Sequence, residues 1–433
     1  MATVGIRIED KYKMEKRAAI TPKHAKDLIN NYDIKFQVES SPKRVFRDEE
    51  YKEAGAEIVK NIDNASIIFG VKEMPIDFFE ENKTYLFFSH TIKGQEYNMP
   101  LLKQMVKKKI NLIEYERITD NDGKRLIFFG RFAGLAGMIN SFWSFGQRCN
   151  AMGRKSPFDK LKQSHLYSSL EEAKAVLSEI AEEIRQYGIP KEMAPLTIGI
   201  TGNGNVSKGA QEIIDLFDNK EISPKELLDL RESGDYNSNT IYKVIFNEND
   251  LSIPKSTNIE FELQHYYKHP EEYKNDFEQY VPKISILMNC MYWGPEYPRI
   301  ITKDFLSDLY KNPKNKLFVI GDVTCDPDGS IEATHMGTFI EDPVFVYNPE
   351  TRKPTMGFDG KGILIMAVDI LPSELPREAS EGFSEALLEF IPDLTKTDFT
   401  QSFDNLNIPA PLKRALILHQ GEFTPDYKYM EEF

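Results

Sequence analysis

The chain has 433 residues, with 54 Lys and Arg against 68 Asp and Glu, so its formal net charge is −14. A chain of this length predicts two or three domains and can bury a core without disulfides or a structural metal. The acidic balance argues against nucleic acid or an anionic membrane as the main partner, because both attract basic proteins.

The three cysteines, Cys149, Cys290 and Cys325, are widely separated and form no CxxC pair, which predicts reduced thiols and no zinc site. His265 and His269 are four residues apart, but no Asp or Glu completes a convincing ligand set, so we expect no metal. The N-terminus lacks the apolar segment of a signal peptide, and no stretch approaches the roughly 18 apolar residues of a membrane span. We therefore expect a cytoplasmic protein without a membrane partner.

The first 115 residues alternate short apolar runs with helical patterns. Strands are predicted at residues 4–8, 35–40, 65–71, 84–88 and 110–115. Helices are predicted at residues 22–30, 48–54 and 99–107, the first with Thr21 as its N-cap and Pro22 in its first turn. Repeated strand–helix units indicate an α/β fold with a parallel sheet that is covered on both faces.

A second block begins near residue 195, with strands predicted at residues 196–200, 284–293 and 317–323 and a helix at 206–217. Between the blocks, residues 169–188 predict a long helix that starts with a capping box, and we interpret it as the crossover between domains. Residues 219–283 are polar and rich in tyrosine, and their strands are not assigned. After residue 362, a strand, a proline turn and a long helix are expected to return to the first block.

A glycine-rich turn at residues 202–209 follows a predicted strand and opens a predicted helix, as a dinucleotide-binding fingerprint requires. Gly202 permits the tight turn, Gly204 lets a pyrophosphate approach, and the helix that starts with Asn205 and Val206 supplies free N–H donors. The third glycine comes two residues late, so an ordinary strand-to-helix turn is the alternative.

Ser223 and Lys225 lie about 20 residues after this turn, where NAD-binding domains carry an acid for the ribose 2′-hydroxyl. A hydroxyl and a cation suit a 2′-phosphate better, so NADP(H) is favoured over NAD(H). Either residue could instead be a solvated loop position.

Polar side chains follow the predicted strands of the first block. Lys72 comes after residues 65–71, and His90 after residues 84–88. If these strands are parallel neighbours, both side chains face one crevice, because the carboxyl ends of parallel strands share an edge. A lysine and a histidine can divide base and acid work near neutral pH. The alternatives are a solvated surface lysine and a structural histidine.

Several segments resemble one enzyme family in the same order along nearly the whole chain. They are GVKEMP (residues 70–75), FFSHTIKGQEYNMPLL (87–102), FGRFAGLAGMI (129–139), TGNGNVSKGAQEI (201–213), NCMYWGPEYPR (289–299), GDVTCDPDGSIE (321–332), ILPSELPREASE (370–381) and PDYKYM (425–430). Together they are similar to the lysine–2-oxoglutarate reductases, the saccharopine-forming relatives of alanine dehydrogenase and of the transhydrogenase N-terminal domain. The resemblance is to the reductase half of aminoadipic semialdehyde synthase, and we expect the saccharopine-oxidising half to be absent.

The resemblance implies two Rossmann-like domains with parallel sheets that flank a central cleft. The catalytic domain would span residues 1–140, completed by about 370–433, and the dinucleotide domain would span 141–369. The implied reaction condenses L-lysine with 2-oxoglutarate and reduces the imine with NADPH to saccharopine, in lysine degradation. The sequence does not decide whether the chain forms a homo-oligomer.

The resemblance also implies roles for individual residues. Lys72 and His90 match the family's catalytic lysine and histidine. Glu15 and Arg17 fall in its substrate-side segment, and Glu116 matches an acid near the catalytic pair. Asp326 resembles an acid near the nicotinamide.

Saccharopine carries three carboxylates, so the substrate site needs cations. The candidates are Arg17, Lys93 and Arg131, because arginine matches carboxylate geometry. Two other functions compete with the reductase: an alanine-dehydrogenase-like, NAD-dependent amino-acid dehydrogenase, and a catalytically silent regulatory module of the same fold.

Overall fold

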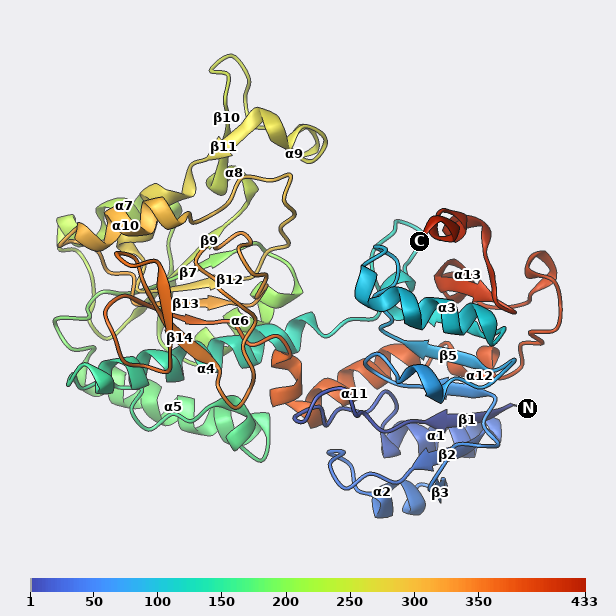
Figure 1. Cartoon of the computed structure of the whole chain (residues 1–433). Helices are drawn as coiled ribbons and strands as arrows, with labels where there is room; N and C mark the ends of the chain where they lie inside the picture. The colour runs from blue at the N-terminus through green and yellow to red at the C-terminus, as the bar shows by residue number, and fades with distance from the viewer. Residues whose placement is uncertain (1) are drawn as a thin grey trace. The chain divides into compact units, whose positions relative to one another are not determined.

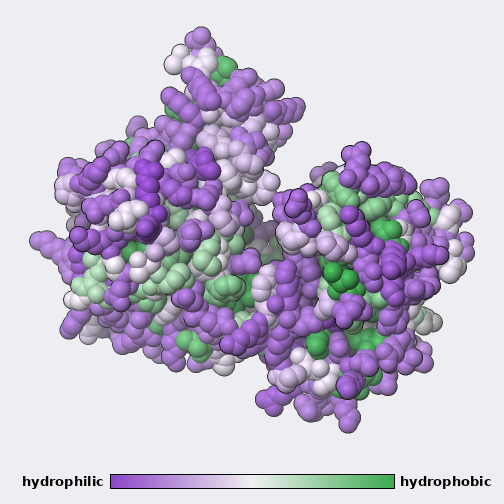
Figure 2. Space-filling model, viewed as in Figure 1, coloured by the Kyte–Doolittle hydropathy of each residue, from purple (hydrophilic) through white to green (hydrophobic). Residues whose placement is uncertain are grey.

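The computed structural model describes residues 2–433 and divides the chain into two compact units (Figure 1). The first unit comprises Met1–Phe129 and Pro376–Phe433, and the second comprises Gly130–Leu375. Hydrophilic residues cover most of the face of each unit that Figure 2 shows, as the high charge content predicts. Among residues 2–433, no helix combines the length and apolar composition needed to cross a membrane.

The first unit is built on an eight-stranded sheet with the order β18-β17-β6-β5-β4-β1-β2-β3. Its strands are β1 Thr3–Ile6, β2 Lys35–Glu39, β3 Glu57–Val59, β4 Ile67–Phe69, β5 Thr84–Phe87, β6 Asn111–Glu114, β17 Leu416–His419 and β18 Glu422–Phe423. Strands β1 to β6 pair in parallel, which confirms the sheet predicted for the first block. The antiparallel hairpin β17–β18 extends this sheet beside β6.

The C-terminal segment packs against the N-terminal one within this unit. Its helices are α1 Pro22–Tyr32, α2 Asp48–Glu53, α3 Met99–Lys107, α11 Pro376–Leu387, α12 Ile391–Leu394 and α13 Ala410–Ala415. The hydroxyls of Ser380 and Ser384, both on α11, accept hydrogen bonds from the main-chain N–H groups of Ala18 and Thr21. Thr21 also caps α1 by accepting from the N–H of His24, as predicted.

The second unit contains another eight-stranded sheet, with the order β15-β14-β16-β13-β12-β7-β9-β8. Its strands are β7 Leu196–Thr201, β8 Asn219–Glu221, β9 Ile241–Phe246, β12 Ile286–Asn289, β13 Val319–Asp322, β14 Val344–Asn348, β15 Lys353–Met356 and β16 Ile363–Met366. All pairs are parallel except those that β14 makes with its two neighbours. The next strand after β7 in sequence, β8, lies at the edge, and β9 separates it from β7.

The helices of this unit include several that the sequence analysis did not predict. The unit's helices are α4 Gly130–Ala151, α5 Leu170–Tyr187, α6 Asn205–Ile214, α7 Pro224–Ser233, α8 Glu248–Leu251, α9 Leu263–Lys268 and α10 Lys303–Lys311. Helix α4 is buried along most of its length, so its sequence lacks the polar face that marks a surface helix. Helix α5 begins at the predicted cap, where the Ser169 hydroxyl accepts from the N–H of Glu172, and lies inside the second unit.

Glycines allow α4 and α6 to approach closely. A Cβ on Gly134 of α4 would lie 1.9 Å from the carbonyl oxygen of Val206, and a Cβ on Gly209 of α6 would lie 2.1 Å from that of Arg131. Gly209 is the glycine that comes late in the fingerprint, and its place in α6 explains the spacing. It serves the contact between the two helices, while Ser207 is buried.

Gly134→Ala should therefore destabilise the second unit, because the added methyl group overlaps main-chain atoms that cannot rotate away. We expect a loss of about 1–3 kcal/mol in the free energy of unfolding, measured by urea denaturation. Gly204→Ala is the matched control, because a Cβ there meets nothing within 4 Å. Equal stability of the Gly134 variant and the wild type would contradict the proposed packing.

Candidate active site

The segment that carries Lys72 leaves the carboxyl end of β4 and is held by a buried carboxylate. Glu9, which follows β1, accepts hydrogen bonds from the N–H groups of Val71 (2.7 Å) and Lys72 (2.9 Å). The hydroxyl of Tyr115 donates to the carbonyl of Gly70, at 3.0 Å. Lys72 itself is half-buried, with Nζ 5.6 Å from the centre of the Tyr12 ring.

His90 follows β5 in a conformation that costs free energy. Its φ of 51° lies in the left-handed region, which non-glycine residues rarely adopt and which is concentrated at functional sites. The preceding turn is fixed by Glu114, whose carboxylate accepts from the main-chain N–H of Ser89 at 2.7 Å. The Asn98 amide donates to the His90 carbonyl at 3.0 Å.

Glu73 joins the Lys72 segment to His90. Its Oε1 lies 2.7 Å from Nδ1 of His90 and 2.7 Å from Nζ of Lys11, while its Oε2 is buried with no hydrogen-bond partner within residues 2–433. Burial raises the pKa of Glu73, but the hydrogen bonds and charges of His90 and Lys11 outweigh burial and lower it to about 2. The structure thus brings the predicted lysine segment and the predicted histidine together around a permanent negative charge.

The pKa values of two neighbouring acids shift in the opposite direction. Glu9 and Glu114 are fully buried, and burial raises the pKa of each to about 7. The nearby negative charge of Glu15 adds to the effect on Glu9, and that of Glu116 adds to the effect on Glu114. Sequence analysis missed both acids as site residues. Their only signal is an acid at or just after the end of a strand.

Two arginines lie on the aromatic rings that surround His90. The Arg17 guanidinium is buried, forms a two-point ion pair with Glu15 (2.6 and 2.8 Å), and lies 4.1 Å from the centre of the Phe129 ring. Arg125 lies 5.3 Å from the centre of the Phe88 ring, which stacks on the His90 ring.

Phe88 and Phe129 also contact each other, so Arg17, Arg125 and His90 belong to one cluster. Glu116, a predicted site residue, is half-buried and pairs with Arg125 at 3.3 Å. Arg125 is a site residue that the sequence analysis missed.

The other two predicted cations are placed differently. Lys93 is exposed in the loop after His90. Arg131 belongs to the second unit, where its exposed guanidinium forms a two-point ion pair with Glu212 of α6. The structure therefore does not place Arg131 in the cluster around His90.

The glycine-rich turn of the second unit has the geometry that the fingerprint predicts. Gly202 has φ 79°, and its N–H donates to the carbonyl of Phe246, the last residue of β9, at 2.8 Å. Gly204 is the N-cap of α6 and has no side chain, so no side chain caps the first N–H groups of Asn205 and Val206.

A buried hydrogen-bond network fixes the strand ends beside this turn. The hydroxyl of Thr201 donates to the side chain of Asn289 at 2.9 Å, and the amide of Asn289 donates to Asp322 at 2.8 Å. These residues end β7, β12 and β13, so one network spans the carboxyl edge of the sheet. Asp326 lies in the loop after β13 and is exposed.

Ser223 and Lys225 lie one strand farther from the glycine turn than expected. The Ser223 hydroxyl caps α7 and shares hydrogen bonds with Glu226, and Lys225 is exposed. The strand that adjoins β7 is β9, and Glu248 begins the helix just after it. Sequence analysis missed Glu248, because it looked about 20 residues after the glycine turn, where β8 ends, and assigned no strands to residues 219–283.

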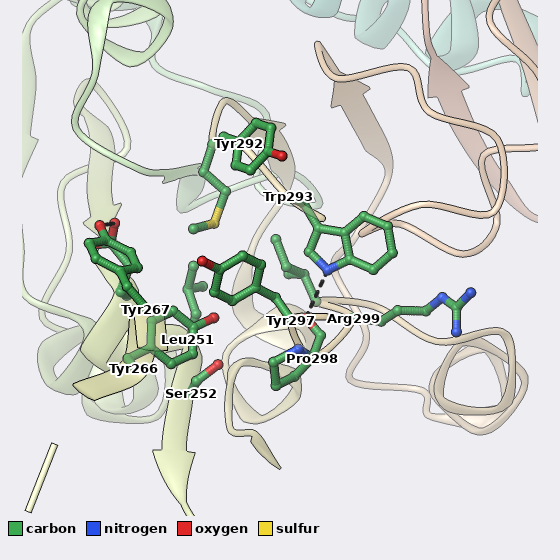
Figure 3. Close-up of a pocket in the computed structure, with 12 residues that line it drawn as sticks. Leu251, Ser252, Tyr266, Tyr267, Tyr292, Trp293, Tyr297, Pro298 and Arg299 are labelled. Carbon is green, nitrogen blue, oxygen red and sulfur yellow. Dashed lines mark hydrogen bonds between the residues drawn. The ribbon is translucent and has the colours of Figure 1, made fainter. Parts of the chain in front are cut away.

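A cavity of about 220 Å³ opens at the ends of β9 and β12 (Figure 3). It is lined mainly by aromatic side chains and one acid: Glu248, Tyr266, Tyr267, Tyr292, Trp293 and Tyr297. Three of these come from the unassigned region 219–283, where strand β10 Ser252–Pro254 pairs with β11 Tyr273–Asn275 around α9. The Tyr267 hydroxyl donates to Glu248 at 3.0 Å. The tyrosine-rich segment thus builds one wall of a pocket beside the glycine turn.

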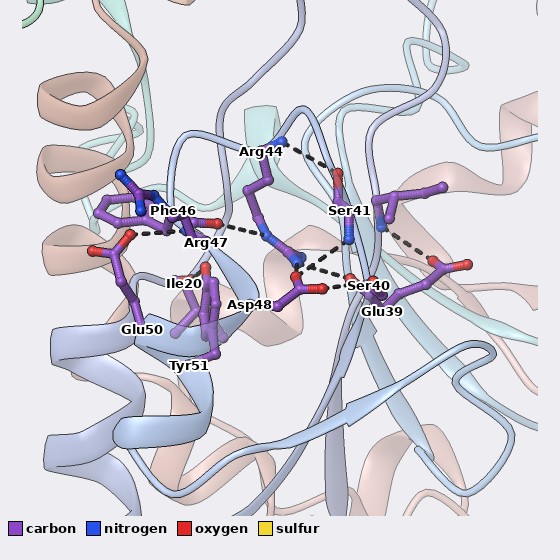
Figure 4. Close-up of polar contacts among 11 residues, drawn as sticks. Ile20, Glu39, Ser40, Ser41, Arg44, Phe46, Arg47, Asp48, Glu50 and Tyr51 are labelled. Carbon is purple, nitrogen blue, oxygen red and sulfur yellow. Dashed lines mark hydrogen bonds and ion pairs between the residues drawn. The ribbon is translucent and has the colours of Figure 1, made fainter.

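The loop after β2 is held by charge contacts of its own (Figure 4). The buried Arg44 donates to Asp48 and to the carbonyl of Glu39, both at 2.8 Å. The Glu39 carboxylate in turn accepts from the N–H of Ile8, at 3.1 Å. These contacts fix the strand end that precedes Glu9.

Carboxylates do accompany the histidine pair, contrary to the expectation from sequence. His269, Glu271 and Glu272 have ligand atoms within 4.8 Å of one another, and all three are exposed. His269 pairs with Glu271 at 3.6 Å and His265 with Glu272 at 3.8 Å. In the structure these two ion pairs hold the cluster together.

The three acids at the sheet edge predict a stability maximum on the pH scale. Between about pH 2 and 4.5, the free energy of unfolding should rise with pH, because ionised Glu73 is stabilised only in the folded state. Between about 4.5 and 7 it should fall, because Glu9 and Glu114 hold their protons longer in the folded state. Urea denaturation across this range measures both slopes. Glu114→Gln should weaken the fall, and an unchanged slope would contradict the assignment.

Comparison with known proteins gives relatives over the whole chain. Residues 5–136 match the family "Alanine dehydrogenase/PNT, N-terminal domain". The chain is 37% identical to alpha-aminoadipic semialdehyde synthase of Arabidopsis thaliana, covering 99% of this chain and 41% of that protein. It is 28% identical to saccharopine dehydrogenase [NAD(+), L-lysine-forming] of Emericella nidulans, covering 89% of this chain and 90% of that protein.

The chain therefore spans less than half the length of the Arabidopsis synthase. Among solved structures, an L-alanine dehydrogenase superposes with a TM-score of 0.64 and 16% identity, covering 99% of both chains. This likeness confirms the predicted fold class, two Rossmann-type α/β domains. The predicted resemblance is also confirmed: over nearly its whole length the chain is homologous to the alpha-aminoadipic semialdehyde synthases and to the L-lysine-forming saccharopine dehydrogenases.

Proposed function

We propose that this chain is an NAD(P)-dependent oxidoreductase of lysine degradation. It would join the ε-amine of L-lysine to 2-oxoglutarate and reduce the imine to saccharopine, or run that reaction in reverse. The observation that carries the proposal is the contact of His90 with Glu73, beside the Lys72 main chain at one edge of a parallel sheet. The names of the homologous proteins supply the substrate class.

The glycine-rich turn fits a pyridine dinucleotide. A Cβ on Gly204 would meet nothing within 4 Å, so the main chain is open to a pyrophosphate at the N-terminus of α6. Gly202, Gly204, Asn205 and Val206 would hold this part of the coenzyme, with Asp326 at the same sheet edge. The coenzyme, when bound, supplies or accepts the hydride.

His90 and Lys72 are proposed to move the protons of the condensation. The nitrogen of the substrate amine attacks the keto carbon while Lys72 takes a proton from that amine, and this proton passes to the former keto oxygen to form the carbinolamine hydroxyl. His90 then gives a second proton to this hydroxyl, which leaves as water and leaves the iminium. Glu73 binds Nδ1 of His90, which orients the ring and leaves Nε2 for the substrate.

The substrate carboxylates need cations, and the cluster around His90 supplies them. We propose that Arg17 and Arg125 bind carboxylates, with Lys93 at the exposed side. Arg131 belongs to the second unit and does not lie on the aromatic rings around His90, so Arg125 takes the place that the sequence analysis gave to it.

The proposal is tested by following NADPH and NADH oxidation with a matrix of amines and 2-oxo acids. Turnover should require both L-lysine and 2-oxoglutarate. Lys72→Met and His90→Gln should each lower kcat by about 10²–10⁴-fold, because each removes one general acid–base group.

Coenzyme affinity provides the control, because both substitutions lie in the first unit and should leave the dissociation constant of NADPH unchanged. Near-wild-type turnover of both variants would remove the two residues from the mechanism. Turnover with pyruvate and ammonia alone would indicate an alanine-dehydrogenase-like activity, and coenzyme binding without any turnover would indicate a regulatory module.

Coenzyme preference is proposed to depend on two opposing charges. The preference for NADP(H) that the sequence favours rests on Lys225, which lies after the outer strand β8 with Ser223. Glu248 lies after β9, beside the glycine turn, where a carboxylate accepts from a ribose 2′-hydroxyl and repels a 2′-phosphate.

Glu248→Gln should therefore raise the ratio of kcat/KM for NADPH to that for NADH by about tenfold, the worth of one charge-assisted hydrogen bond. Lys225→Ala should lower the ratio if its ammonium reaches the 2′-phosphate. Steady-state kinetics with both coenzymes measures the ratio, and a ratio unmoved by either substitution would place the ribose elsewhere.

The cytoplasm remains our proposed location, from the acidic composition and the three cysteines, which are all free. Cell fractionation tests this location, and light scattering shows whether the chain assembles with copies of itself.

A further inference from the structure

Glu9 has an unusual position for a carboxylate. It is buried, with 5% of its surface exposed, and each of its oxygens accepts a hydrogen bond from a successive main-chain N–H. The donors, Val71 and Lys72, lie two and three residues after β4, whereas Glu9 lies three residues after β1. A single side chain therefore ties the ends of two neighbouring strands together.

The contact fixes the main chain from which the Lys72 side chain starts. Carbonyl groups of the same segment are held as well: Tyr115 donates to Gly70 at 3.0 Å, and the N–H of Phe88 donates to Val71 at 3.1 Å. The N–H groups of Val71 and Lys72 donate to the two oxygens of Glu9. Because the two N–H groups point at one carboxylate, the peptide plane between Val71 and Lys72 cannot rotate without losing a bond.

Stability alone does not explain a carboxylate at this place. Burial and the charge of Glu15 both oppose ionisation of Glu9, so the fold is destabilised when the acid carries its charge. Glu9 thus contacts the Lys72 segment and lies near enough to Glu15, the ion-pair partner of Arg17, to feel its charge.

We propose that Glu9 is a positioning residue that sets the direction in which Lys72 enters the active site. The inference deepens the proposed function, because it rests on the role of Lys72 there. Glu9 does not itself contact substrate or coenzyme in this proposal. It acts through the N–H groups of residues 71 and 72.

Glu9→Gln provides the first test, because the amide can accept from one N–H but turns a donor toward the other. Hydrogen exchange of a peptide covering residues 70–75, followed by mass spectrometry, should become about tenfold faster, as expected for one lost hydrogen bond. The kcat for saccharopine formation should fall about 10- to 100-fold, the usual effect of a misplaced catalytic group. The dissociation constant of NADPH should not change.

Glu50→Gln is the matched control, since Glu50 accepts from the N–H of Arg47 at 2.8 Å in the same unit, away from Lys72. It should leave exchange at residues 70–75 and kcat at wild-type values. If Glu9→Gln folds poorly, Glu9→Asp gives the same test, because its shorter side chain cannot reach both N–H groups.

A readout on Lys72 itself separates positioning from general stability. The rate at which trinitrobenzenesulfonate modifies Lys72, measured by peptide mass spectrometry, should change in the Glu9 variant and not in the Glu50 variant. Unchanged exchange, labelling and kcat in a folded Glu9 variant would overturn the inference. Altered exchange and labelling in a protein that never forms saccharopine would keep the positioning role and refute the proposed function instead.

Discussion

Main-chain N–H groups that leave the ends of parallel strands need acceptors, and buried carboxylates supply them at this site. Glu9 accepts hydrogen bonds from the N–H groups of Val71 and Lys72. Glu114 accepts one from the N–H of Ser89, the residue before His90. A buried N–H that loses its acceptor costs about 1–3 kcal/mol, so each carboxylate fixes the turn that it serves. The left-handed conformation of His90 persists because this turn is held from both sides.

Glu73, Glu9 and Glu114 show that the contacts of a carboxyl group, and not its residue type, set its pKa. Glu73 contacts Lys11 and His90, which lower its pKa, whereas Glu9 and Glu114 contact mostly N–H and O–H donors, and burial raises the pKa of each to about 7. The local charge of the site is therefore independent of the overall −14. An acidic protein can present arginines to a substrate with several carboxylates, because the neighbouring acids are either paired or have a raised pKa.

Local signals made much of the fold predictable from sequence. Apolar runs gave the strands of the first sheet, and the caps at Thr21 and Ser169 gave the starts of α1 and α5. Helix α4 was missed because a helix buried on nearly all sides has no amphipathic period. The order of β8 and β9 was missed for another reason: strand neighbours are set by long-range pairing, which leaves no mark on either strand's own residues.

The residues of the candidate site also divide into those that could be predicted from sequence and those that could not. Lys72 and His90 could be predicted, since polar residues after neighbouring parallel strands meet at one edge. Arg125 and Arg131 could not be assigned to different units from sequence, because they are only six residues apart and lie on either side of the same apolar run at residues 126–129. What separates them is the start of α4 at Gly130, where the chain passes from one unit to the other. A boundary between compact units depends on which surfaces bury each other, so only the folded chain shows that Arg125 lies on the ring stacked against His90.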